Sequence, residues 1–302
     1  MIFNSKKRRG LSIASSQISW VELDCSKRGN PEIKVSASES LPAGLINPFF
    51  SKKNIDDREA LKLAIGKIIP GGYKTGDIAL SIPDHIAKIT SLKFDELPAN
   101  RQEIEQLILW RIKKTVPLPV DAIKLDFISY KRSDDTFDVT ASVASRAILR
   151  EYEDILKEMG LRPRLVDISS LNALRAFEDV LPQSCLFIEL SEDSLGMAII
   201  DEGRLSFFRS KELEGASDKA VSDKVKKEIA STLAYFRTTY PEKEIGAICF
   251  HSTIPGSEEI VNGLEAGFEG TIVNLSVSDC ISEELDNIDE HLAPAIGGAL
   301  RL

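Results

Sequence analysis

The first residues of the chain predict a β-hairpin. Two strand-like segments, residues 11–15 and 18–23, are rich in apolar side chains and are separated by a short polar turn. This pattern is typical of two antiparallel strands joined by a tight connection. The tip of the hairpin is expected to carry Ser15, Ser16 and Gln17.

A third strand and an amphipathic helix are expected next. Residues 32–40 alternate apolar and polar positions, as a strand with one buried face does. Asn54 is a good N-cap for the following helix, and Pro70 ends the helical pattern. The apolar residues of this helix recur at helical spacing at Leu61, Ala64, Ile65 and Ile68.

Residues 77–160 predict a compact β/α insertion. The expected elements are strands over 77–83, 86–92, 124–131 and 137–144 and helices over 104–112 and 148–159. Gly160 stands where a left-handed C-terminal cap is expected. Trp110 lies off the apolar stripe of the first of these helices. That helix is therefore either a partner surface anchored by Trp110 or a core helix with one partly exposed tryptophan.

The second half of the chain repeats the opening in outline. After a strand over 164–167 and a helix over 171–177, we expect strands over 185–190, 195–201, 204–208, 245–250 and 271–275, with a long helix over 221–236. The order strand, turn, strand, strand, helix thus occurs twice. This predicts a duplicated unit whose loops face a common cleft.

Composition excludes several classes of protein. The 302 residues are enough for about two domains, and the formal charge of −9 argues against general affinity for nucleic acid. The four cysteines have no metal-ligand spacing and predict neither structural zinc nor disulfides. No segment has the length of a membrane span or the pattern of a secretory signal. The basic cluster at residues 6–9 is a contact for an anionic membrane surface, a contact for an acidic partner, or a solvated tail.

Catalytic motifs are scarce. The three histidines are far apart, and the chain has no H-E-x-x-H, G-x-S-x-G or Walker A motif. The turns between paired strands are better candidates, because a tight turn whose backbone N–H groups point into a cleft can hold phosphates. Such a site favours glycine in the turn and a carboxylate nearby to organise Mg²⁺.

Several segments, taken in order, resemble the PilM family of type IV pilus assembly proteins. Members of this family are actin-like ATPases related to the division protein FtsA. The opening segment, residues 10–23, is the longest of them. The others are residues 41–46, 116–119, 125–127, 160–163, 166–167, 173–174, 209–215 and 295–301. The resemblance covers essentially the whole chain and is carried by the order and spacing of these segments.

The resemblance implies a two-lobed α/β fold of the actin-like ATPase (ribonuclease H-like) class. A first lobe over residues 1–182 would contain the small subdomain shared by PilM and FtsA, at about 77–160, and a second lobe would span 183–302. It also implies a cytoplasmic protein at the inner face of the inner membrane. Its implied partners are the cytoplasmic N-terminal tail of PilN, a membrane protein, and the pilus motor ATPases. The resemblance leaves open whether the protein forms a homo-oligomer or a ring.

The phosphate-binding loops depart from the family pattern. The first loop has Ser12 and Ala14 where the family has Asp-x-Gly. Ser12 brings no charge to hold a hydrated metal, and the Cβ of Ala14 crowds the amides that would meet a phosphate. The second loop keeps a carboxylate at Glu189 but has Ser191 in place of glycine.

Two further glycine positions have changed as well, at Ala216 and around His251. The candidate nucleotide-site positions are Ser12, Ala14, Ser15, Ser16, Gln17, Glu189, Ser191 and Gly215. We predict that the fold has kept its shape and lost hydrolysis, without catalytic or metal-binding residues. No cofactor is expected; ATP with Mg²⁺ is the alternative. These small polar residues also suit ordinary turns of a protein that never bound nucleotide.

The predicted function is therefore that of a scaffold for pilus assembly that recognises a peptide through apolar contacts and main-chain hydrogen bonds. Three other functions stay open. One is an active ATPase of the actin and sugar-kinase superfamily, for which Glu189 is the one acidic residue at a phosphate loop. Another is a division-type filament protein, which would carry an amphipathic C-terminal membrane helix, whereas this sequence ends at Leu302. The third is a cytoplasmic platform component of a type II secretion or MSHA-type pilus system.

Overall fold

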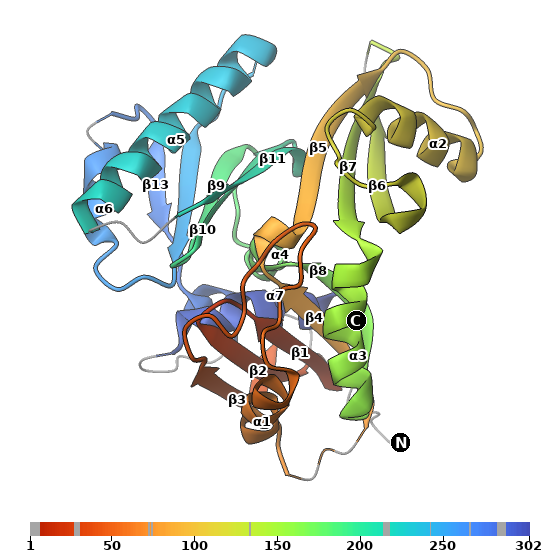
Figure 1. The fold of residues 1–302 in the computed structure, drawn as a ribbon. Helices are drawn as coiled ribbons and strands as arrows, with labels where there is room; N and C mark the ends of the chain where they lie inside the picture. Colours follow the sequence, from red (N-terminus) through yellow and green to blue (C-terminus); the bar gives the residue numbers. More distant parts are fainter. Residues whose placement is uncertain are drawn as a thin grey trace.

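Two five-stranded sheets with the same strand order form the body of the molecule (Figure 1). The computed structural model describes residues 7–26, 31–71, 73, 75–132, 134–213, 218–241, 243–265, 267–282 and 288–302. The first sheet has the order β3-β2-β1-β4-β8, and its strands are β1 (Lys7–Ile13), β2 (Gln17–Asp24), β3 (Glu32–Ser40), β4 (Gly76–Ile82) and β8 (Leu161–Ile168). The second has the order β11-β10-β9-β12-β13, with β9 (Cys185–Leu190), β10 (Ser194–Asp201), β11 (Arg204–Glu212), β12 (Ala247–Ser252) and β13 (Thr271–Asn274).

The two sheets are duplicates in topology. In each, three consecutive strands pair antiparallel, and the fourth and fifth lie parallel to the first. The predicted duplication is therefore confirmed, and so is the predicted fold class.

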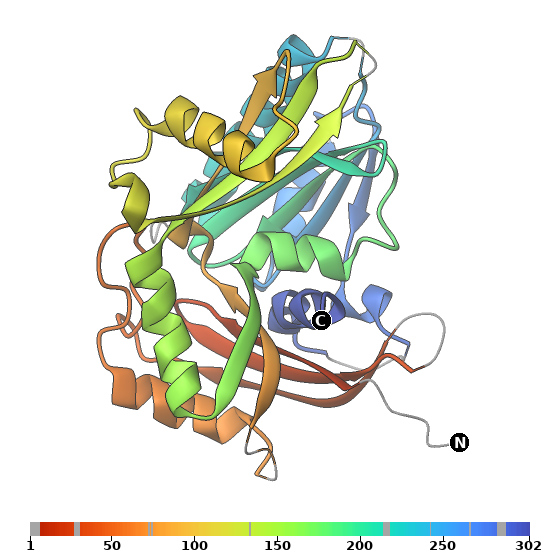
Figure 2. The ribbon, with the colours of Figure 1, turned by 90° about the vertical axis from the view of Figure 1, so that its right-hand side faces the viewer.

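Helices cover both faces of each sheet. The helices are α1 (Arg58–Ile68), α2 (Arg101–Ile112), α3 (Arg146–Glu158), α4 (Ser169–Ala176), α5 (Asp218–Thr239), α6 (Glu258–Glu265) and α7 (Ala293–Leu300), with short 3₁₀ turns η1 (Asp84–Ile86), η2 (Val120–Ala122), η3 (Val277–Cys280) and η4 (Glu290–Leu292). Apolar cores join α1 and α3 to the first sheet and α5 and α6 to the second. A third core places α4 and α7 between the two sheets, as Figure 2 shows.

A separate three-stranded sheet stands beside the second sheet. It has the order β5-β7-β6, formed by β5 (Ala87–Phe94), β6 (Ile123–Lys131) and β7 (Phe137–Ser145), and α2 covers one of its faces. The expected insertion at residues 77–160 includes, at each end, an element that does not belong to this sheet. The strand at its start, β4, pairs with β1 and β8, and α3 at its end packs on the first sheet.

The N-cap of α1 differs from the expectation. Asp57, not Asn54, accepts hydrogen bonds from the free amides of the first turn. Asn54 instead holds the preceding loop, because its side chain bonds the backbone of Phe49 and Lys52. The predicted apolar face of α1 is buried, and Gly160 has the expected positive φ, 80°.

Small residues let α7 approach its neighbours closely. A side chain at Gly10 of β1 would overlap the backbone of Ala295, and one at Gly297 would overlap the backbone of Asn172 in α4. A buried chain of hydrogen bonds runs alongside, from Asn172 to the hydroxyl of Ser81 (2.6 Å) and from that hydroxyl to the carbonyl of Pro294 (2.8 Å). The helix α7 is thus fixed to both β4 and α4.

Candidate functional site

The two hairpin turns that the sequence singles out meet at a small cavity between the lobes, which we call the interlobe cavity. Its lining residues are Ser12, Ala14, Gln17, Ser19, Pro83, Asp84, Ser169, Ser170, Glu189, Ser191, Asp193, Ser194, Thr253, His291 and Pro294. Its volume is about 40 Å³. That is room for a few water molecules, whereas pockets for small molecules start at about 300 Å³.

Each turn closes on itself through a backbone hydrogen bond. The amide of Ala14 donates to the carbonyl of Gln17 (2.9 Å), and the amide of Ser191 donates to the carbonyl of Ser194 (2.9 Å). The hairpin is confirmed, with Gln17 as the first residue of β2. Because these two amides already have acceptors, a phosphate would have to displace a turn hydrogen bond to reach them.

Side chains from the first turn also bond to the second half of the chain. The hydroxyl of Ser15 donates to the carboxylate of Asp193, and the amide of Gln17 donates to Asp289 (3.0 Å). Ser16 does not line the cavity, and its carbonyl accepts from the amide of Leu41 (2.7 Å). Gly215 lies outside the described residues. The structure thus brings most of the predicted positions together around the cavity, and two of their side chains bond to Asp193 and Asp289.

Buried carboxylates make the interlobe cavity electronegative. Burial raises the pKa of Asp84 to about 6 and also raises the pKa of Asp193. Asp84 accepts from the amide (3.0 Å) and hydroxyl (2.5 Å) of Ser170 at the start of α4. The described residues that line the cavity include no lysine or arginine. Such a site opposes the approach of a triphosphate, which needs cations or free amide donors.

Glu189 belongs to a buried ionic triad. His251 of β12 is fully buried, its Nδ1 lies 2.6 Å from Oε2 of Glu189, and its Nε2 lies 2.9 Å from Oε2 of Glu290. The ring of Phe177 packs against the imidazole at 4.9 Å between centroids. Burial alone would lower the pKa of His251, but the two carboxylates outweigh it and raise this pKa to about 9. The imidazole is therefore a cation at neutral pH.

The triad gives the carboxylate of Glu189 a partner other than a metal ion, because it pairs with His251. The sequence shows Glu189 and His251 far apart, whereas the parallel register of β9 and β12 places them side by side. Glu290 also accepts from the hydroxyl of Ser276 (2.7 Å) and the amide of Val277 (2.9 Å). Taken together with the cavity volume and the closed turns, this arrangement does not fit a nucleoside triphosphate with Mg²⁺.

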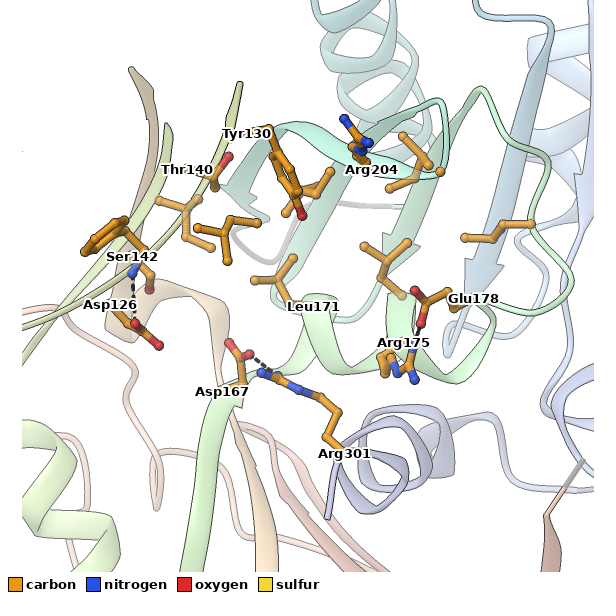
Figure 3. Close-up of a pocket in the computed structure, with 18 of the residues that line it drawn as sticks. Asp126, Tyr130, Thr140, Ser142, Asp167, Leu171, Arg175, Glu178, Arg204 and Arg301 are labelled. Atoms are coloured by element: carbon orange, nitrogen blue, oxygen red, sulfur yellow. Dashed lines mark hydrogen bonds and ion pairs between the residues drawn. The ribbon is translucent and has the colours of Figure 1, made fainter. Parts of the chain in front are cut away.

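A much larger groove lies between the three-stranded sheet, α4 and the turn that joins β10 to β11 (Figure 3). Its volume is about 740 Å³. Figure 3 shows Tyr130 and Thr140 of the small sheet on one side and Leu171 and Arg175 of α4 on another. Its apolar lining residues are Ile89, Phe127, Ile128, Leu165, Val166, Leu171, Leu174, Leu181, Pro182, Ile200 and Leu205.

Most charged side chains of the groove belong to ion pairs. Asp167 pairs with Arg301, and Glu178 pairs with Arg175. The guanidinium of Arg204 lies over the ring of Tyr130, 5.3 Å from its centroid. With most of its charges paired, the groove presents an apolar floor with polar edges, which suits a ligand of mixed character.

Tyr240, directly after α5, joins the small sheet to the second lobe. Its ring is buried and lies within cation–π distance of Lys93 (4.5 Å), Arg132 (5.4 Å) and Lys243 (5.9 Å). Burial raises the pKa of its phenol, so the neutral ring faces these cations. The sequence alone indicates no role for this residue, because its partners come from distant segments.

The comparisons with known proteins agree with this architecture. The solved structure of a PilM–PilN type IV pilus biogenesis complex matches with a TM-score of 0.81 and 16% identity, over 97% of this chain and 98% of that one. The cytoplasmic domain of EpsL, an inner membrane component of the type II secretion system of Vibrio cholerae, matches with a TM-score of 0.56 and 12% identity, over 98% and 96% of the two chains. A Bacteroides thetaiotaomicron protein with an actin-like ATPase fold matches with a TM-score of 0.50 and 10% identity, over 93% and 95%.

A search of curated protein sequences finds no significant match. Within the described part of the chain, no helix combines the length and apolarity needed to cross a bilayer. The sequence profile of the type IV pilus assembly protein PilM matches residues 10–223, which is more than half of the chain. The chain therefore belongs to the PilM family of type IV pilus assembly proteins.

Proposed function

We propose that this protein is a scaffold of a type IV pilus system that holds the cytoplasmic N-terminal tail of a PilN-like membrane protein and does not hydrolyse ATP. The observation that carries the proposal is the contrast between two sites. The groove beside α4 holds about 740 Å³, whereas the interlobe cavity holds about 40 Å³. The match to a PilM–PilN complex supports the choice of partner.

The groove suits an extended peptide better than a small polar metabolite. Its floor offers apolar side chains from β5, β6, β8, α4, β10 and β11, and Thr140 and Ser142 of β7 add hydroxyl groups for hydrogen bonds to a main chain. An extended segment presents side chains alternately to opposite sides, so one set fills the apolar floor and the other faces outward.

Ile128 gives the most direct test of this site. Its side chain is 43% exposed and lines the groove. Ile128→Asp is expected to weaken peptide binding by about 30-fold or more, because an unpaired carboxylate covered by the ligand costs at least about 2 kcal/mol. Binding is measured by calorimetry with a synthetic peptide of the cytoplasmic N-terminal tail of a PilN-like membrane protein.

Leu63→Asp is the matched control. Leu63 is 71% exposed on α1 and does not line the groove, so this variant should bind the peptide as the unchanged protein does. A peptide that fails to bind the unchanged protein, or that binds Ile128→Asp equally well, would refute the assignment of the groove.

ATP turnover tests the second half of the proposal. Mg²⁺-dependent phosphate release by the unchanged protein should not exceed that of Ser12→Ala, because the amides of both turns are already bonded and the cavity is small. Turnover that Glu189→Gln abolishes would contradict this expectation and restore an active ATPase as the function.

A further inference from the structure

Two segments far apart in the sequence carry exposed aromatic side chains. In the loop of residues 47–53, Phe49 is 46% exposed. In residues 109–120, which contain the end of α2 and the turn after it, Trp110 is 71% exposed. The prediction that Trp110 lies off the core is thereby confirmed. Neither ring lines the interlobe cavity or the groove.

These segments lie side by side. Phe50 packs against the core of the small sheet, which includes Ile112 and Val116. The ammonium of Lys88 lies 5.1 Å from the ring centroid of Phe50 and donates to the carbonyl of Thr115 (3.2 Å). Figure 2 shows the orange loop beside the olive segment that follows α2. We call residues 47–53, Lys88 and residues 109–120 the basic aromatic surface.

The charge of this surface is opposite to that of the whole chain. Its cations are Lys52, Lys53, Lys88, Arg111, Lys113 and Lys114, and it contains no aspartate or glutamate, whereas the chain has a net charge of −9. Among the described residues, no hydrogen bond or ion pair neutralises Arg111, Lys113 or Lys114. This local field attracts an anionic partner.

Helical spacing places the tryptophan and two of the cations on one side. Ile108 and Ile112 are buried against the small sheet, and Trp110 lies between them in sequence, on the opposite side of α2. Lys113 keeps helical backbone angles, so the ammonium groups of Lys113 and Lys114 follow Trp110 at the i+3 and i+4 positions. The ring and these charges therefore face outward together.

We propose that the basic aromatic surface binds the headgroup region of a bilayer that contains anionic lipid. Tryptophan prefers the membrane interface, and lysines near an anionic surface are attracted to it. Five of the six cations are lysine, a residue depleted at protein–protein interfaces, which favours a lipid surface over an acidic protein. This inference is independent of peptide binding in the groove.

The N-terminal basic cluster does not offer an equivalent surface in its described residues. Lys7 (2.6 Å) and Arg9 (2.8 Å) both pair with Glu22, and Arg8 donates to the carbonyl of Leu300. Lys6 lies outside the described residues. We therefore assign the membrane contact to the basic aromatic surface and not to residues 6–9.

Vesicle binding tests the proposal. The protein is expected to sediment with vesicles of phosphatidylcholine and phosphatidylglycerol and not with vesicles of phosphatidylcholine alone. Binding should shift the tryptophan emission to the blue; because Trp20, the other tryptophan, is fully buried, the shift reports Trp110. Lys113→Ala combined with Lys114→Ala should weaken binding at least about tenfold, since each lysine near the surface contributes about a factor of five.

Lys227→Ala combined with Arg237→Ala is the matched control, because it removes two exposed cations from α5, far from α2 in Figure 1. This control should bind the anionic vesicles normally, and thermal unfolding should be unchanged in both double variants. Absence of binding to anionic vesicles would overturn the proposal, even if the surface then bound an acidic protein. Equal binding by the two double variants, or equal binding to both lipid compositions, would overturn it as well.

Discussion

Gly297→Ala is expected to destabilise the protein by about 3 kcal/mol or more, or to prevent its folding. The new Cβ would overlap the carbonyl of Asn172 and approach the amide of Ala176, so α7 would have to move away from α4. Backbone atoms cannot turn aside as the end of a long side chain can, which makes this overpacking severe. Urea unfolding followed by circular dichroism measures the loss.

Gly66→Ala provides a matched control for this change. Gly66 lies in α1, and a Cβ there would meet no atom within 4 Å apart from its chain neighbours and the backbone of its own helix. Alanine should therefore stabilise α1 by about 0.5–1 kcal/mol through its higher helix propensity. If Gly297→Ala unfolds at the same urea concentration as the unchanged protein, the close contact between α7 and α4 is not required for folding.

His251→Gln is expected to cost about 3 kcal/mol or more at neutral pH. The substitution leaves the carboxylates of Glu189 and Glu290 close together without the cation between them, and breaking a buried ion pair in this way is strongly destabilising. The further substitution Glu189→Gln removes one of the two charges and should recover part of the loss.

The pH dependence of stability distinguishes this charge effect from simple loss of packing. The pKa of His251 is raised from 6.5 to about 9 in the folded protein. Its contribution is therefore fully present below about pH 6.5 and is lost as the pH rises through about 9, a change of about 3 kcal/mol. The unfolding free energy should fall over this window in the unchanged protein and not in His251→Gln. Equal pH profiles would show that the triad is not ionised.

Most helices and strands could be predicted from local sequence patterns, because the side chains that determine each of them lie within a few residues of one another. The apolar spacing of α1 and the alternation of β3 need no distant partner, and both segments match the structure. The N-cap assigned to Asn54 was wrong for a tertiary reason. The carboxylate of Glu151, in α3, accepts from the amides of Asn54 and Ile55 and holds that segment as a loop. A sequence window around Asn54 contains no trace of that contact.

The candidate site was predictable only in part, for the same reason. The turns at Ala14 and Ser191 could be located from strand patterns, and both line the interlobe cavity. His251, the partner of Glu189, could not be identified from the sequence. Their contact depends on the parallel register of β9 with β12, two strands separated by α5. A charged residue inside an otherwise apolar strand, as in Cys185–Leu190, was the one local sign that a buried partner exists.

The cations around the ring of Tyr240 also bear on how the molecule would carry mechanical load. Lys93 and Arg132 come from the small sheet, whereas Tyr240 and Lys243 follow α5 of the second lobe. Tension applied along a peptide in the groove would therefore pass into both lobes at once, instead of bending the small sheet about a single hinge. Under such a load, we expect the small sheet and the second lobe to move together as one stiff unit.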